Sequence, residues 1–367
     1  MDLLFGVGEE FVARLEPRLG GRVVGLSVAD DRDDDGARGE RGLGERAADR
    51  RRCQGGMTWR PGGIMVDVRG PIVVGADGSD TGARAVRWAA VEAAARGADL
   101  HIVHATALDA PGGHRPDYAA RLVREAGQDI LDEAVVQAVG QVPGLGVTST
   151  LSRDSAARAL LGEAGSDGMI VVGSRGLGGF AALLLGSVGL RVAACATVPL
   201  VVVRGEHEPV PTGVVVAALR NERDLDAARF AARAAGRRKA SLRVWSAYTF
   251  YQYAGSMVPM LDDVTEIAEE QASATARLVA PLRDEFPTLT VTVDVVRAPS
   301  VAGALVDVSA HADLLVLGAR RPEHTIGAPL GHVAHAVLHH AYCPVAMVPD
   351  DEPHRADGVA PLSHPGS

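Results

Sequence analysis

From residue 71 onward, short apolar runs alternate with longer stretches in which apolar residues recur at helical spacing. The runs predict buried strands over residues 72–75, 100–104, 147–151, 169–172 and 200–203. The intervening stretches predict helices over residues 80–96, 118–139, 155–163 and 187–195. Gly97 is placed to end the first helix, and Asp154 is the expected N-cap of the third. Regular alternation of strand and helix is typical of a parallel, doubly wound sheet.

The same pattern occurs a second time further along the chain. Residues 214–216 match 72–74 at an offset of 142, and residues 240–247 match 98–105 at the same offset. Residues 314–318 then match 169–173 at an offset of 145, so one three-residue insertion separates the two registers. Constant offsets of this kind predict a duplicated α/β domain.

The repeat divides the chain into four parts. The first domain covers residues 69–205 and the second covers residues 212–349, with a segment containing two prolines between them. Residues 1–68 include the charged stretch 30–56, which holds little that could enter a core, so we expect a disordered or weakly structured N-terminal extension. Residues 350–367 are expected to form a disordered tail.

Composition and charge restrict the functional classes. The net charge of -9 argues against nucleic acid or an anionic membrane surface as a partner. Cys53, Cys195 and Cys343 are too far apart in sequence to form a CxxC pair, which favours a reducing compartment. No apolar run approaches the roughly 18 residues that span a bilayer, and Asp2 with Glu9 and Glu10 does not fit a signal peptide. We therefore expect a cytoplasmic protein.

A glycine-rich segment between a strand and a helix carries the strongest chemical signal. It has the spacing Gly173-x2-Gly176-x9-Gly186-Ser187. Gly173 would let a ligand approach the backbone at the strand end, and Gly176 is expected to take a positive φ. Gly186 and Ser187 stand at a helix N-terminus, where unpaired N–H groups and the helix dipole favour an anion. The segment therefore predicts a phosphate site.

The first strand ends in Gly75-Ala-Asp77-Gly-Ser79, and together with the glycine segment this resembles the universal stress proteins of the ATP-binding type. The resemblance covers residues 70–204 well and 212–349 more loosely. It implies two tandem doubly wound domains, each a five-stranded parallel sheet of order 3-2-1-4-5, with ATP, with or without Mg²⁺, in a cleft. It also implies that Asp77 holds the ribose or adenine side and that Ala105 contacts adenine. The phosphates would be lined by Gly173, Gly176, Gly186, Ser187 and Val188.

The second domain departs from this pattern. Leu219 stands in place of Asp77, Arg321 in place of Gly176 and His332 in place of Ser187. Its cleft is therefore either empty, which is the preferred interpretation, or binds a different anion through Arg320 and Arg321. His335 and His339 have an i, i+4 spacing that can ligate zinc, but no third ligand is evident, so no metal site is predicted.

Three functions are compatible with the sequence. The first is an ATP-binding stress-response or signalling protein that is not an enzyme, because no Walker lysine or nucleophile with a base accompanies the glycine segment. The others are an adenine-nucleotide hydrolase of the same superfamily, with weak ATPase activity, and a dimerisation or interaction module that binds no nucleotide. The last strands, over residues 200–203 and 345–348, are expected to pair in an intramolecular pseudo-dimer, with a homodimer as a further arrangement.

Overall fold

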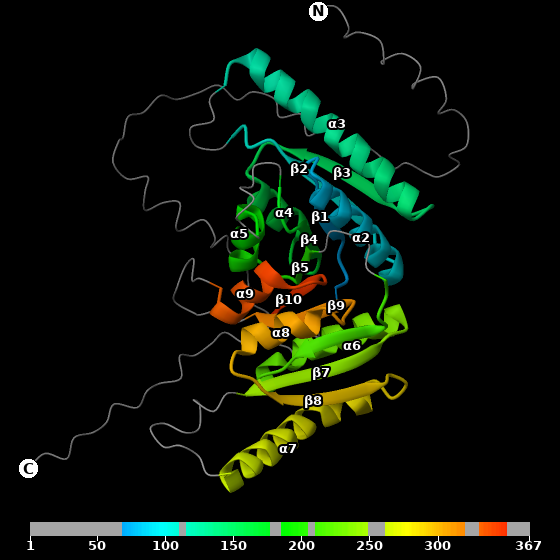
Figure 1. Cartoon of the computed structure of the whole chain (residues 1–367). Helices are drawn as coiled ribbons and strands as arrows, with labels where there is room; N and C mark the ends of the chain where they lie inside the picture. The colour runs from blue at the N-terminus through cyan, green and yellow to red at the C-terminus, as the bar shows by residue number, and fades with distance from the viewer. Residues whose placement is uncertain are drawn as a thin grey trace, which may run out of the picture.

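The protein contains one ten-stranded sheet to which both halves of the chain contribute (Figure 1). The computed structural model describes residues 68–109, 115–176, 185–204, 210–248, 261–319 and 330–350, and for residues 261–266 it describes the backbone alone. The strand order across the sheet is β3-β2-β1-β4-β5-β10-β9-β6-β7-β8. The N-terminal extension up to residue 67 and the tail from residue 351 lie outside the described residues.

The first half of the sheet is parallel and has the order 3-2-1-4-5 that the resemblance implies. Strands and helices alternate along the chain as expected. They are β1 (Ile72–Gly75), α2 (Asp80–Arg96), β2 (Leu100–Ala105), α3 (Asp117–Gln141), β3 (Val147–Ser152), α4 (Ala156–Ala164), β4 (Met169–Gly173), α5 (Ser187–Cys195) and β5 (Leu200–Val203).

The second half repeats this order with strands β8-β7-β6-β9-β10, and its neighbouring strands are also parallel. A short 3-10 helix, η2, precedes its first α-helix. The elements are β6 (Val214–Ala218), η2 (Glu222–Asp224), α6 (Leu225–Arg238), β7 (Ser241–Tyr248), α7 (Leu261–Glu285), β8 (Val291–Arg297), α8 (Val301–Ser309), β9 (Leu314–Ala319), α9 (His332–His340) and β10 (Val345–Pro349).

The two halves meet through their last strands, which are the strands that the sequence predicts to pair. Strand β5 pairs antiparallel with β10, with Val202 opposite Val345 and Leu200 opposite Met347. Pairing satisfies the backbone groups of two strands that would otherwise be open edges. The side chains of both strands are buried from Leu200 to Val203 and from Val345 to Val348, so the junction lies inside the hydrophobic core.

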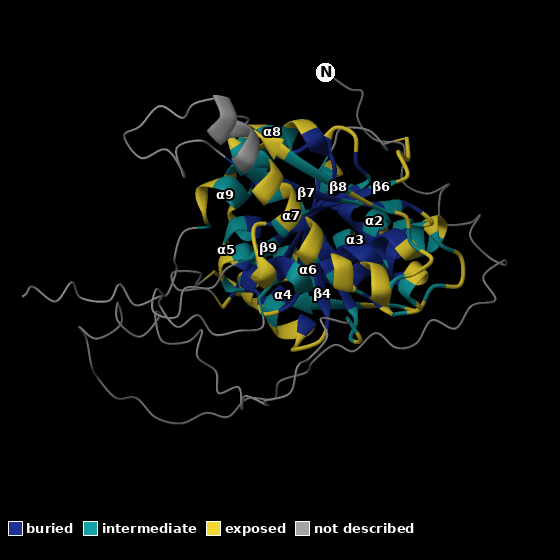
Figure 2. Cartoon of the chain, turned by 90° about the horizontal axis from the view of Figure 1, so that it is seen from below, coloured by how far each residue is buried: buried dark blue, intermediate teal, exposed yellow. Residues whose placement is uncertain are grey.

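Helices cover both faces of the sheet and enclose two hydrophobic layers. One layer joins α2, α3, α6 and α7 to the sheet, and the other joins α4, α5, α8 and α9 (Figure 1). Figure 2 shows the buried residues concentrated along the strands, with the exposed ones on the outward helix faces. Ala85, Ala89 and Ala93 of α2 are fully buried, and their small side chains let this helix pack close to the sheet.

Most predicted helix ends are confirmed within one or two residues, and one predicted cap is wrong. Helix α2 begins after Ser79, whose hydroxyl accepts from the Gly82 amide, and ends at Gly97 with φ 64°. Helix α4 begins after Ser155 and not after Asp154. The Asp154 carboxylate instead accepts a hydrogen bond from Arg158 at 2.9 Å, so it pairs along the helix surface and does not cap the backbone.

Helices α2 and α6 contact each other across the junction through corresponding residues of the two domains. The Arg96 guanidinium lies 5.2 Å from the Phe230 ring centroid, and the Arg238 guanidinium lies 5.6 Å from the Trp88 ring centroid. Trp88 and Phe230 correspond at the offset of 142, as do Arg96 and Arg238. The contact is therefore nearly symmetric, like the interface of a two-fold dimer, although it lies within one chain.

One acid at this contact has no counterpart in the second domain. Glu92, 3% exposed, accepts from Arg96 and from Arg238, both at 2.6 Å, and Arg237 lies 3.6 Å away. Burial alone would raise the pKa of the Glu92 carboxyl, but the Arg238, Arg96 and Arg237 guanidiniums together lower it below its ordinary value. Glu92 thus holds three cations of both domains in place.

We expect Glu92→Gln to destabilise the protein by about 3–5 kcal/mol at pH 7, because it removes the buried negative charge that pairs with Arg96 and Arg238. The folded-state pKa of Glu92 lies below its unfolded value, so its contribution is complete above about pH 4.5 and is lost as the pH falls through the folded-state value. Urea unfolding of the wild type and of Glu92→Gln, measured at about every pH unit from about pH 3 to about pH 7, checks this pH dependence.

The exposed Glu125 provides a matched control on α3. Glu125→Gln should change the free energy of unfolding by less than about 0.5 kcal/mol at every pH. If Glu92→Gln unfolds at the same urea concentration as Glu125→Gln, the charge cluster does not stabilise the junction.

Candidate functional site

A pocket opens at the carboxyl ends of β1 and β4, where the order of the sheet reverses. Its volume is about 480 Å³, and this position is the one at which open α/β sheets bind ligands. The wall combines the ends of β1, β2 and β4 with the first turns of α4 and α5. It is lined by Gly75, Ala76, Asp77, Gly82, Val103, His104, Ala105, Ala156, Leu160, Val172, Gly173, Arg175, Gly176, Gly186, Ser187, Val188 and Gly189.

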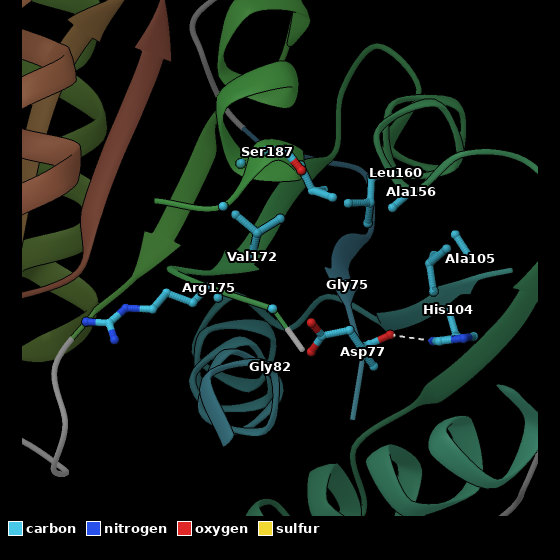
Figure 3. Close-up of a pocket in the computed structure, with 17 residues that line it drawn as sticks. Gly75, Asp77, Gly82, His104, Ala105, Ala156, Leu160, Val172, Arg175 and Ser187 are labelled. Atoms are coloured by element: carbon cyan, nitrogen blue, oxygen red, sulfur yellow. Dashed lines mark hydrogen bonds between the residues drawn. The ribbon is translucent and has the colours of Figure 1, made fainter. Parts of the chain in front are cut away.

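The loop after β1 fixes the Asp77 carboxylate. Its Oδ1 accepts from the backbone amide of Ser79 at 3.1 Å and from the Ser79 hydroxyl at 2.6 Å. Between them Gly78 has φ 76°, a conformation that glycine adopts at low cost. The Asx turn and the helix cap thus share Ser79, and they hold the carboxylate at the mouth of the pocket (Figure 3).

Two glycines make room for this carboxylate. A Cβ on Gly82 would lie 2.5 Å from Asp77 Oδ1, and a Cβ on Gly176 would lie 2.5 Å from Asp77 Oδ2. Gly176 does not have a positive φ, so that prediction is wrong. The backbone at Gly176 is ordinary, and the residue is glycine because a carboxylate occupies the space of a side chain.

Gly173 has a packing role in addition to the predicted one, which stays a prediction. A Cβ there would lie 2.7 Å from the Thr81 carbonyl oxygen and 3.0 Å from the Gly82 amide nitrogen. The missing side chain therefore lets the end of β4 contact the first turn of α2, although Gly173 does line the pocket. The Thr81 hydroxyl strengthens this contact by donating to the Arg175 carbonyl at 2.5 Å.

The N-terminus of α5 forms the opposite end of the pocket. Gly186 is its N-cap, without a side-chain cap, and the Gly186 amide donates to the Ser174 carbonyl at 2.9 Å. The following amides of Ser187, Val188 and Gly189 belong to the first turn, which has no acceptors within its own helix. The helix dipole adds a partial positive charge, so this end of the pocket can bind an anion such as phosphate.

A third part of the pocket wall is apolar except for a histidine. Ala105, Ala156 and Leu160 line it, and His104 lies beside them at the end of β2 (Figure 3). His104 Nδ1 lies 2.8 Å from the Ala76 carbonyl oxygen. Since a carbonyl only accepts, Nδ1 carries the hydrogen. Sequence reasoning missed this residue, although a polar side chain next to the predicted adenine contact was a visible signal.

The structure brings all the predicted site residues together. The same pocket is lined by Asp77, Ala105, Gly173, Gly176, Gly186, Ser187 and Val188. Their binding of ATP stays a prediction. The Arg175 side chain extends away from Asp77 in Figure 3, toward the second domain, so its backbone belongs to the wall while its guanidinium points elsewhere.

The corresponding place in the second domain is filled by side chains. Asp224, 1% exposed, corresponds to Gly82, and Arg220 corresponds to Gly78. The Arg220 guanidinium donates to Asp224 at 2.6 Å and 2.9 Å and to the Gly318 carbonyl at 3.1 Å. Leu219, in place of Asp77, is buried. The acid and base that replace Gly82 and Gly78 thus bond to each other and to the end of β9. Arg320 and Arg321 lie outside the described residues.

The histidines of α9 stack on each other. The His335 and His339 rings lie 4.2 Å apart, and burial together with the charges of His335, Arg204 and His340 lowers the pKa of His339. Among the described residues, no group of three or more His, Cys, Asp or Glu side chains could hold a metal ion.

Comparison with known proteins identifies the family. The model of the universal stress protein family matches residues 69–204 and again residues 212–349. The chain belongs to the universal stress protein family. A universal stress protein of Mycolicibacterium smegmatis is 29% identical over 290 residues, which cover 76% of this chain and 96% of that protein. One of Mycobacterium tuberculosis is 34% identical over 134 residues, 36% of this chain and 45% of that protein.

Solved structures agree with this family at the level of the fold. A crystal structure of a universal stress protein from Archaeoglobus fulgidus superposes with a TM-score of 0.56 at 15% identity, over 78% of this chain and 98% of that one. Another similar structure is a universal stress protein in complex with cAMP, 30% identical over 37% of this chain and 96% of that one, with a TM-score of 0.28. Within the described residues of our chain, no helix is long and apolar enough to cross a membrane.

The two kinds of glycine in this stress-protein pocket should respond differently to a methyl group. Gly173→Ala should destabilise the protein by about 1–3 kcal/mol, because the new Cβ meets backbone atoms that have no room to move. Gly186→Ala should cost less, about 0.5–1 kcal/mol, since the nearest atom to its Cβ would be 3.8 Å away and the cost is that of a poorer N-cap alone. Thermal unfolding of the two variants beside the wild type is the measurement. Equal melting temperatures for the two variants would contradict the packing role of Gly173.

Proposed function

We propose that this universal stress protein binds one ATP per chain, in the first domain, and acts as a nucleotide-binding stress-response or signalling protein. The observation that carries the proposal is the pocket between Asp77 and the N-terminus of α5. It offers a fixed carboxylate, an apolar slot and a row of backbone amides within one cavity of about 480 Å³. A nucleotide has the matching parts, since its ribose hydroxyls donate, the flat faces of its base pack against apolar side chains, and its phosphates are anionic.

The arrangement supports one orientation of ATP. Asp77 would accept from a ribose hydroxyl, and the base would lie against Ala105, Ala156 and Leu160. The phosphates would then extend toward Gly186, Ser187 and Val188, where the helix dipole favours negative charge. Asp77 is the one acid among the described lining residues, so a Mg²⁺ ion that accompanies ATP would depend mainly on the phosphates for its ligands.

We also propose that binding, and not hydrolysis, is the function. The described lining residues include no side chain that is placed beside Ser187 to act as its base, and no lysine. The alternative is an adenine-nucleotide hydrolase of the same superfamily, with weak ATPase activity. The two proposals differ in the product, because a hydrolase releases ADP at a steady rate while a binding protein returns intact ATP.

The paired domains support a further proposal, that the chain forms its own intramolecular pseudo-dimer. The junction of β5 with β10 and the charge cluster of Glu92 already fill the surfaces that a second copy would use. A homodimer would then require a different face of the protein. The third function in question, an interaction module that binds no nucleotide, predicts the same junction but no ligand.

Isothermal titration calorimetry tests the ATP proposal. We expect one site per wild-type chain, and we expect Asp77→Ala to weaken binding by about tenfold to a hundredfold, the worth of a hydrogen bond to a charged group. Gly176→Val should weaken it at least as much, because its side chain collides with the carboxylate. Asp80→Ala is the matched control, since Asp80 is an exposed acid three residues further along, at the start of α2, that does not line the pocket.

Several results would overturn parts of this proposal. Two equivalent sites per chain would show that the second domain also binds, and an unchanged affinity in Asp77→Ala would place the site elsewhere. Steady release of ADP would favour the hydrolase. Titration with cAMP, the ligand of one solved relative, is included because tighter binding of cAMP than of ATP would replace the proposed ligand.

A further inference from the structure

The hydrogen-bond pattern of β2 leaves one residue of the strand open toward the pocket. In a parallel strand, alternate residues bond to the neighbours on either side. On the β3 side, the Leu100 amide donates to the Gly146 carbonyl and the Thr106 amide donates to the Ser152 carbonyl. On the β1 side, the Val103 carbonyl accepts from the Ala76 amide. By this alternation, the N–H and C=O groups of Ala105 both point to the β1 side. Strand β1 has already ended there, because its pairing with β2 stops at Gly75 and Val103.

The next acceptor in the β1–β2 hydrogen-bond ladder would be the Ala76 carbonyl, and the His104 side chain binds it. In a regular extension of the β1–β2 pair, the Ala105 amide would donate to the Ala76 carbonyl. Instead, His104 Nδ1 donates to that carbonyl over 2.8 Å. A side chain thus ends the ladder one residue early, and the backbone edge of Ala105 faces a pocket that both residues line.

The His104 ring is held in place from its other side. A Cβ on Gly127 of α3 would lie 2.9 Å from His104 Cδ2 and 3.3 Å from Nε2, so the helix backbone packs against the ring. Gly127 is buried within α3, and its missing side chain is what admits the imidazole. Two elements, α3 and the loop after β1, therefore fix the orientation of His104.

We propose that His104 is a positioning residue for the base of the nucleotide. By binding the Ala76 carbonyl it holds the loop that leads to Asp77, and it keeps the N–H and C=O groups of Ala105 available as an adjacent donor and acceptor. A flat heterocyclic base with an acceptor beside an amino donor, as adenine has, is the ligand class that this edge suits. The part of this inference that concerns ATP rests on the proposed function, whereas the hydrogen bond from His104 to the Ala76 carbonyl does not.

Three variants separate the hydrogen bond from packing. Asparagine places its amide nitrogen near the position of Nδ1, while glutamine places it one bond further, and leucine has no donor. We expect His104→Asn to bind ATP within about threefold of the wild type, and His104→Gln and His104→Leu to bind about tenfold or more weakly, the worth of one lost hydrogen bond. Inorganic tripolyphosphate, which has no base, should bind all four proteins equally.

A loss of tripolyphosphate binding together with ATP binding would show general damage to the pocket and overturn the proposal. Equal ATP affinity in the Asn and Leu variants would overturn it as well. Rescue by asparagine alone, confined to ATP, is the result that supports it.

A measurement without nucleotide keeps this inference separate from the proposed function. In His104→Leu the Ala76 carbonyl is released, so the Ala105 amide should pair with it and exchange its hydrogen more slowly than in the wild type, by about tenfold or more. In His104→Asn the exchange should stay as fast as in the wild type. A wild type that binds no nucleotide refutes the proposed function, and the exchange rates then decide the role of His104. Equal rates in all variants would overturn it.

Discussion

The pocket of this protein depends on a contact between two pieces of backbone. The end of β4 at Gly173 lies against the Thr81 carbonyl in the first turn of α2, with no room for even a methyl group. This contact sets the distance between the loop after β1 and the glycine segment after β4. The Asp77 carboxylate then fits between Gly82 and Gly176 because neither has a side chain. Two glycines around the Asp77 carboxylate and a third at the contact between β4 and α2 therefore shape the site, and the core of the sheet supports them.

The second domain meets the same constraint in a different way. Its strand-end glycine, Gly318, again lies at the corresponding helix start, but the gap holds the buried Asp224 carboxylate. Arg220 neutralises this charge with two hydrogen bonds and also bonds the Gly318 carbonyl. A buried carboxylate is stable only with such a partner. Among the described residues, the two clefts thus differ where Gly78 and Gly82 of the first domain are replaced by a paired base and acid, Arg220 and Asp224.

Sequence reasoning was accurate where local pattern decides the structure. The alternation of strands and helices, the constant offsets and the ends of α2 follow from periodicity and from the properties of Ser79 and Gly97. It failed where a contact across the sheet decides. Gly176 seemed to need a positive φ, since nothing local shows that Asp77 fills its side-chain position. Arg220 and Asp224 have the spacing of a surface helical pair, and only the fold shows that the carboxylate is buried. Nothing near His104 in the sequence showed its role, because its hydrogen-bond partner, the Ala76 carbonyl, lies in the loop after β1.

The junction of the domains shows how a duplicated chain can lose symmetry in one place and keep it in another. The ring and guanidinium pairs of α2 and α6 are present in both copies. The charges around them are present in one copy only. At the offset of 142, Glu92 corresponds to Ala234, and Arg237 corresponds to Ala95. Two copies of the second domain in this arrangement would bring Arg237 and Arg238 together twice with no acid between them. Like charges at a buried contact are costly, so the charge pattern favours pairing of the first domain with the second. The asymmetry that distinguishes the two clefts thus extends to the junction between them.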